Sequence, residues 1–206
     1  MLAIEPAPAA SKNPVAGGAI VWGAAALAVM AVFAVALFAM GRPLICPCGT
    51  IELWHGAAND DGTSQHVSDW YSLSHVIHGF LFYGAAHLLG RLRGRSFPFG
   101  AALCVAVLVE GGWELVENSS FVIDRYRETT ASDSYAGDSV LNSMADIAFM
   151  ILGFAAARLA PAWAVGSAAV GMELLALYVI RDNLTLNVLM ILWPLEAVKN
   201  WQAALR

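Results

Sequence analysis

The sequence predicts an all-α membrane protein, a polytopic transmembrane helical bundle of about six spans with both termini in the cytoplasm. Three observations predict this fold: an apolar composition, a series of apolar runs of bilayer length, and an uneven distribution of basic residues between the connecting segments. Of the 206 residues, 59% are hydrophobic and only 13% are charged, whereas about a quarter of an average soluble domain is charged. The net charge of −5, with no basic stripe interleaved with aromatic residues, argues against a nucleic-acid partner. We therefore expect the lipid bilayer to surround the chain.

The apolar runs define the predicted spans. A hydrocarbon core about 30 Å thick needs about 20 mostly apolar helical residues to cross it. Six segments are candidates: 18–40, 70–89, 99–121, 139–159, 162–180 and 184–198. The last is short and contains Pro194, so it either crosses with a tilt or lies half-inserted, which leaves five spans as the alternative. Residues 1–17 are predicted to form a mobile N-terminal tail, and residues 18–206 a single transmembrane helical domain.

The basic residues predict the orientation, because cytoplasmic loops carry an excess of lysine and arginine. They gather in the segments predicted to face the cytoplasm, namely Arg91, Arg93, Arg95, Arg158, Lys199 and Arg206. Segments 41–69 and 122–138 are richer in acids and are predicted to face the periplasm. The first apolar run lacks a good cleavage site and is interpreted as a retained anchor. A bacterial inner membrane is the expected location.

Polar side chains gather in the outward halves of the second, third and fourth predicted spans. Such side chains are costly inside a bilayer, so each needs a partner, a wet cavity or a function. They are Ser74, His75, His78, Glu110, Glu114, Glu117, Asp138, Asn142 and Asp146. At a rise of about 1.5 Å per residue, these side chains lie at a similar depth in the membrane. Within each predicted span they are spaced by three, four, seven or eight residues, so the polar residues of one span share one face of its helix. The sequence therefore predicts a His/Glu/Asp pocket that opens to the periplasm.

Several acids in a low dielectric need protons, arginine partners or a divalent cation. His75, His78 and Asp146 are predicted to bind a divalent metal ion, with zinc as the first choice, although the HExxH and CxxC patterns are missing. Glu110 and Glu114 are predicted catalytic bases. The residues predicted to support the site are Ser74, Glu117, Asp138 and Asn142. A purely structural polar network of the same residues stays open as the alternative.

Two further features lie beside the predicted pocket. Arg125 and Arg127 follow the third span, and their guanidinium forks are predicted to bind phosphate or substrate, with solvated interfacial anchors as the alternative. Cys46, Pro47 and Cys48 follow the first span. The two cysteines are interpreted as ordinary thiols near the interface, with a disulfide bridge or a metal contact as alternatives.

Four motifs carry a resemblance to a known family. They are SQHVSDWY at 64–71, SHVIHGF at 74–80, EGGWELVEN at 110–118 and YAGDSVLNSMAD at 135–146. Together they resemble an uncharacterised family of multi-pass inner-membrane proteins of proteobacteria, over residues 40–200. Segments 113–117 and 138–146 are also loosely similar to small VanZ-like membrane proteins. The resemblance implies a topology and a location, and it implies no activity.

The sequence leaves three functions open. The first is a membrane-embedded, metal-dependent hydrolase or transferase that acts on a lipid or lipid-linked substrate at the outer leaflet. The second is a transporter in which the same acids relay protons or bind a cation. The third is an assembly or interaction protein of a larger membrane complex, in which the polar network only fixes helix packing.

Overall fold

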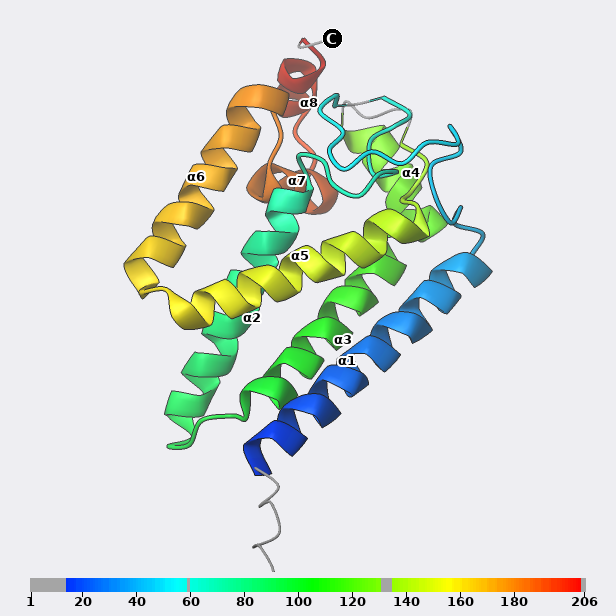
Figure 1. Ribbon diagram of the computed structural model, residues 1–206. Helices are drawn as coiled ribbons and strands as arrows, with labels where there is room; N and C mark the ends of the chain where they lie inside the picture. The colour runs from blue at the N-terminus through cyan, green and yellow to red at the C-terminus, as the bar shows by residue number, and fades with distance from the viewer. Residues whose placement is uncertain (1–13, 59, 131–134, 205–206) are drawn as a thin grey trace, which may run out of the picture.

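The computed structural model describes residues 14–58, 60–130 and 135–204, which fold into eight α-helices and contain no strand (Figure 1). The helices are α1 (Pro14–Ala39), α2 (Ser72–Leu92), α3 (Phe99–Glu117), α4 (Ser120–Thr129), α5 (Val140–Leu159), α6 (Ala162–Ile180), α7 (Leu184–Leu192) and α8 (Glu196–Ala203). Of the predicted N-terminal tail, residues 1–13 lie outside the described residues, and α1 already begins at Pro14. The all-helical prediction is confirmed.

Four helices are long and apolar enough to cross a membrane: Gly18–Ala39, Phe99–Glu117, Val140–Leu159 and Ala162–Ile180. Large apolar side chains cover the outer faces of these helices, among them Leu27, Val35, Phe38, Val105, Leu174 and Tyr178. Exposed apolar surface on this scale suits contact with lipid rather than water. The 21-residue α2 is also long enough to span about 30 Å, but it carries three histidines and an arginine, and the number of crossings stays a prediction.

The sixth predicted span is not one continuous helix. Segment 184–198 contributes to two short helices, α7 and α8, which are separated at Pro194 because proline cannot continue a helix. The nine residues of α7 reach only about 14 Å, which is half of a hydrocarbon core. The third predicted span also ends early, at Glu117, and is followed by the separate helix α4.

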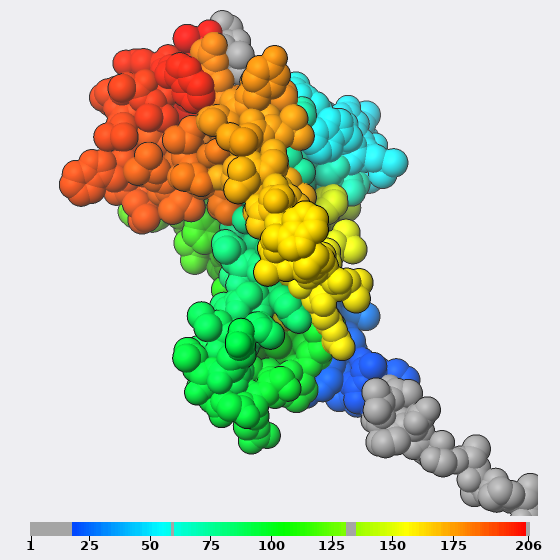
Figure 2. All heavy atoms as spheres, turned by 90° about the vertical axis from the view of Figure 1, so that its left-hand side faces the viewer, coloured from blue at the N-terminus to red at the C-terminus, as the bar shows by residue number. Residues whose placement is uncertain are grey.

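The C-terminal helices lie at the opposite end of the bundle from the start of α1. Figures 1 and 2 both show α7 and α8 at the end that carries the segment connecting α1 to α2. At that end the Lys199 ammonium group donates a hydrogen bond to the Glu128 carbonyl oxygen, which links α8 to α4. The side of the membrane on which each terminus lies stays a prediction.

Glycines bring α2 and α5 into close contact. A Cβ atom added to Gly79 would lie 2.1 Å from the Met150 carbonyl oxygen, and one added to Gly153 would lie 2.1 Å from the Val76 carbonyl oxygen. Small residues allow helix backbones to approach this closely within a membrane. Gly79 lies one turn after His75 on α2, so this crossing brings the polar part of α2 against α5.

An apolar core fills the bundle next to the polar cluster. Its fully or almost fully buried members are Val107, Ile147, Met150 and Phe154, from α3 and α5. Ile147 directly follows Asp146 on α5, Met150 and Phe154 follow one and two turns later, and Val107 precedes Glu110 on α3 by one turn. The polar cluster therefore lies between this core and the end of the bundle at which α1 ends and α5 begins.

Candidate functional site

Glu110 joins the two histidines of α2 to α3. The Glu110 carboxylate accepts a hydrogen bond of 2.6 Å from Nδ1 of His75 and bonds of 3.0 and 3.1 Å from Nδ1 of His78. Both histidines can reach the same carboxylate because their spacing of three residues places them on one face of α2. Glu110 is fully buried. When a neutral ring donates its Nδ1 proton in this way, its Nε2 keeps a lone pair that can bind a ligand.

His75, Glu114 and Asp146 form a second group, from three different helices. Potential ligand atoms of the three side chains lie within 4.8 Å of one another. The distance from His75 to Asp146 is 3.7 Å between Nε2 and Oδ2, and that from His75 to Glu114 is 3.7 Å between Nδ1 and Oε1. All three residues are buried, and within the part of the chain that the structure describes neither carboxylate oxygen of Glu114 has a hydrogen-bond partner. A buried carboxylate without partners is costly, so this position favours a cation.

Glu117 and Asp138 extend the cluster toward the end of the bundle. Together with Glu114 they form another group with potential ligand atoms within 4.8 Å. Asp138 accepts hydrogen bonds from Nδ2 of Asn118 at 2.7 Å and from the Tyr135 hydroxyl at 2.8 Å. Burial raises the pKa of Asp138, and these two hydrogen bonds only partly offset the rise. Asp138 therefore has less tendency to ionise than an ordinary aspartate.

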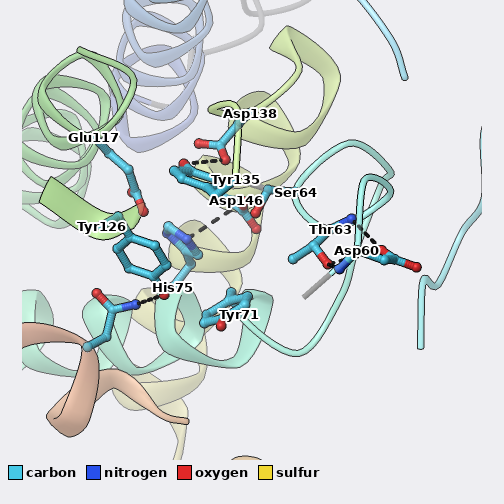
Figure 3. A pocket seen from close by; sticks show the side chains of 11 residues that line it. Asp60, Thr63, Ser64, Tyr71, His75, Glu117, Tyr126, Tyr135, Asp138 and Asp146 are labelled. Atoms are coloured by element: carbon cyan, nitrogen blue, oxygen red, sulfur yellow. Dashed lines mark hydrogen bonds and ion pairs between the residues drawn. The ribbon is translucent and has the colours of Figure 1, made fainter. Parts of the chain in front are cut away.

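Several of these side chains line a small, partly open space, which we call the chamber (Figure 3). It is lined by Asp60, Thr63, Ser64, Tyr71, His75, Glu117, Tyr126, Tyr135, Asp138, Asp146 and Asn187. The free volume is about 30 Å³, which holds one or two water-sized occupants. No lysine or arginine lines the chamber among the residues that the structure describes. Positive charge for the carboxylates must therefore come from the histidines, from protons or from a bound cation.

Two larger hollows adjoin the chamber on different sides. The apolar groove, of about 250 Å³, lies between α2, α3 and α7 and shares four residues with the chamber: Tyr71, His75, Glu117 and Asn187. Its other lining residues are Ser74, His78, Phe82, Val109, Glu110, Trp113, Leu184 and Val188. The outer basin, of about 770 Å³, lies over the connection between α1 and α2 and shares Asp60, Thr63 and Tyr135 with the chamber. The chamber thus lies between a polar basin and a mainly apolar groove.

Most of the residues predicted from the sequence come together, in groups that differ from the predicted sets. His78 is grouped with His75 and Glu110, whereas Asp146 is grouped with His75 and Glu114. The carboxylate of Glu110, the predicted base, accepts hydrogen bonds from two imidazoles. These contacts divide the predicted metal set of His75, His78 and Asp146 between two overlapping groups.

The other predicted residues lie outside the chamber. Nε of Arg125 donates to the Ile191 carbonyl oxygen at 3.1 Å, and Nε of Arg127 donates to the Tyr135 carbonyl oxygen. The structure does not bring either guanidinium to the chamber. Asn142 supports the site from a distance, because its Nδ2 donates to the His66 carbonyl oxygen at 2.9 Å and thereby holds the outer segment on α5.

Sequence reasoning missed a network of tyrosines around Asp182. The hydroxyls of Tyr71 and Tyr126 donate to Oδ2 of Asp182 at 3.1 and 3.3 Å. Nδ2 of Asn187 donates to the Tyr126 hydroxyl at 2.6 Å. Burial raises the pKa of Asp182 to about 6. The sequence signal was the pair Asp182 and Asn183 between two apolar segments, a polar position that needs a partner.

Comparisons with known proteins agree with the resemblance seen in the motifs. Residues 37–204 match the model of a family described as "Protein of unknown function (DUF2585)". A UPF0314 protein of Novosphingobium aromaticivorans is 53% identical over 92% of this chain and 94% of its own length. Others from Sphingopyxis alaskensis and Rhizobium etli are each 51% identical, over 86% and 89% of this chain and 93% and 92% of their own lengths. No solved structure matches significantly. The predicted membership of a proteobacterial family without a described function is confirmed.

Proposed function

The chain belongs to the DUF2585 family of proteins of unknown function, and we propose that it is a metal-dependent hydrolase or transferase acting on a lipid or lipid-linked substrate in the bacterial inner membrane. The observation that carries this proposal is the buried Glu114 carboxylate, which has no hydrogen-bond partner among the described residues and lies beside His75 and Asp146. A polar network that only fixed helix packing would be expected to satisfy its own buried oxygens. Glu114 therefore favours a ligand over a purely structural role.

The donor set fits a divalent cation held by His75, Glu114 and Asp146. One imidazole and two carboxylates suit zinc, and they suit manganese or iron as well. Glu110 then acts as a positioning residue, because its hydrogen bond to Nδ1 of His75 orients the ring and leaves Nε2 for the cation. A cation bound here would lower the pKa of a bound water, and hydrolysis requires such an activated water.

Glu117 is suited to move a proton in the reaction. It lines both the chamber and the apolar groove, and it is only partly buried. A carboxylate at this junction can reach both a water in the chamber and a group that enters from the groove. We assign the role of general base to Glu117 in place of Glu110, because the Glu110 carboxylate already accepts hydrogen bonds from two histidines.

The two hollows on either side of the chamber support an amphiphilic substrate. Phe82, Val109 and Val188 in the groove can contact an acyl chain, while the chamber and the outer basin offer carboxylates, hydroxyls and water to a headgroup. The apolar core of Val107 and Ile147 lies on the inner side of the cluster. A polar path through the bundle is therefore missing at that level among the described residues, which favours an enzyme over a transporter.

The metal content of the detergent-purified protein tests the proposal. We expect about one equivalent of a divalent metal per chain, and we expect Glu114→Gln to remove it. Glu128→Gln is the matched control, since it removes the same charge from an exposed side chain outside the chamber. Comparison of membrane lipids between a deletion strain and a strain complemented with Glu117→Gln then tests the reaction. Wild-type protein that takes up no metal, together with lipids that do not change on deletion, would refute the proposal and favour an assembly role.

A further inference from the structure

The outer basin contains a second reactive group that the proposed metal site does not use. Cys46 and Cys48 are joined by a disulfide bond, and both line this basin beside His66. We propose that this Cys-Pro-Cys pair is a thiol–disulfide exchange site that accepts two electrons from a dithiol reductant. The proposal stands independently of the metal site, because none of its three residues lines the chamber.

The two sulfur atoms differ in access. Cys48 lies exposed at the surface, whereas only 3% of Cys46 is exposed. Attack on a disulfide requires a thiolate to approach one sulfur in line with the bond, so access selects the sulfur that reacts. A reductant therefore reaches Sγ of Cys48, and Sγ of Cys46 is the leaving group.

The surroundings of Cys46 suit a leaving thiolate. The backbone N–H of Cys48 points at the sulfur of Cys46, with an N–S distance of 3.2 Å. A ring nitrogen of the buried His66 lies within 4.8 Å of both sulfur atoms. Nδ1 of His66 accepts the backbone N–H of Glu52 at 3.2 Å, so Nε2 carries the proton of the neutral ring. A nearby N–H donor and an imidazole both stabilise a thiolate.

The first turn of α5 holds the cysteines and the histidine in place. The backbone N–H groups of Val140 and Leu141 donate to the carbonyl oxygens of Pro43 and Leu44, at 2.8 and 3.1 Å. These bonds fix the segment that leads into Cys46. On the same turn, the Asn142 side chain holds the carbonyl of His66. Because one rigid helix end supports both halves of the site, the distance between the imidazole and the sulfurs is set by the fold.

The exchange proceeds in two balanced steps. A thiolate of the reductant attacks Sγ of Cys48, a new bond forms between these sulfurs, and the bond between Cys46 and Cys48 breaks. The electron pair of that bond goes to Sγ of Cys46, which then takes a proton. The second thiol of the reductant, as its thiolate, attacks the mixed disulfide, so the reductant leaves as a disulfide and Cys48 is left as a thiol. One dithiol is oxidised, and one protein disulfide is reduced.

The full-length protein in detergent allows a direct test. In a Cys104→Ala background, Cys46→Ser leaves only Cys48 and Cys48→Ser leaves only Cys46. We expect oxidised glutathione to form a mixed disulfide with Cys48 at least about ten times faster than with Cys46, as measured by intact mass. Equal rates, or faster reaction of Cys46, would overturn the assignment of the attacked sulfur.

A second measurement tests whether the bond exchanges at all in the folded chain. We expect dithiothreitol to reduce the wild-type disulfide without denaturant, as detected by maleimide labelling. His66→Asn keeps an acceptor for the Glu52 N–H but removes the second ring nitrogen, and we expect it to slow this reduction at least about threefold. Thermal melting of each variant checks that it is folded. A disulfide that is reduced only after unfolding would refute exchange and leave a structural crosslink.

Discussion

The substitution Gly79→Ala tests whether the close crossing of α2 and α5 positions the candidate site. The added Cβ would lie 2.1 Å from the Met150 carbonyl oxygen, 2.5 Å from the Phe154 nitrogen and 2.8 Å from the Gly153 carbonyl carbon. All three atoms belong to the backbone of α5, so no side-chain rotation can relieve the overlap. The two helices must separate by about 1 Å before the contact reaches an ordinary van der Waals distance.

The expected cost follows from that separation. Overpacking of this kind costs about 1–3 kcal/mol. For a chain of this size, each kcal/mol lowers the melting temperature by roughly 2–4 °C. His75 lies one turn before Gly79, so the 3.7 Å distance between His75 Nε2 and Asp146 Oδ2 should increase as well. Because a metal site tolerates displacements of only about 0.5 Å, we expect the metal affinity to fall at least about tenfold.

Gly84→Ala is the matched control on the same helix. A Cβ at Gly84 meets no atom within 4 Å, and alanine stabilises a helix by up to about 1 kcal/mol relative to glycine. Tryptophan fluorescence during heating and a metal titration of both variants in detergent measure the two effects. If Gly79→Ala melts at the temperature of Gly84→Ala and binds metal equally well, the crossing does not position the site.

Three further substitutions test other parts of the arrangement. The pKa of Asp182 is about 6 in the fold against an ordinary 3.8, so ionisation opposes folding. Wild-type stability should fall by about 2 kcal/mol between pH 4 and 7 through this group. In melting scans across this range, Asp182→Asn should not show that part of the fall. Arg127→Ala should change metal affinity less than about twofold, since Arg127 does not line the chamber; a larger loss in a metal titration would show that Arg127 acts on the metal site. Val188→Trp should fill the groove and reduce crosslinking to a photoreactive phospholipid while the metal content stays unchanged; undiminished crosslinking would argue against a lipid in the groove.

The cluster itself could be predicted from the sequence because helical periodicity determines which side chains share a face. His75 and His78 are three residues apart, and Glu110 and Glu114 are four apart, so each pair had to point in one direction from its helix. Apolar helices cannot turn such faces to lipid. Helical periodicity predicts these faces without any information about the loops, and α2, α3 and α5 do bring the side chains of the cluster together.

The division of roles within the cluster could not be predicted, because periodicity places a side chain on a face without naming its partner. How closely Glu110 or Glu114 approaches the histidines depends on the rotation of α3 relative to α2. Contacts with other helices, such as that of Gly111 with the Phe33 ring of α1, constrain this rotation, and helical periodicity does not specify them. The same limit applies to Tyr126. The balance of charges predicts an outer loop for segment 122–138, whereas Tyr126 lies on the helix α4. Tertiary contacts, rather than the local sequence pattern, determine the surroundings of the two glutamates and of Tyr126.

The C-terminal segment shows why hydropathy alone does not decide between a full crossing and a half-inserted segment in that region. An apolar run next to a membrane can either cross it or cover a hollow in the protein, and both uses select the same residues. The break at Pro194 leaves α7 too short to cross, and Asn187 and Val188 of this helix instead line the apolar groove. Asn187 also reaches the chamber, where its hydrogen bond to Tyr126 joins α7 to α4. The apolar character of α7 is therefore explained by the groove that it helps to form, and the chain needs no sixth crossing to account for it.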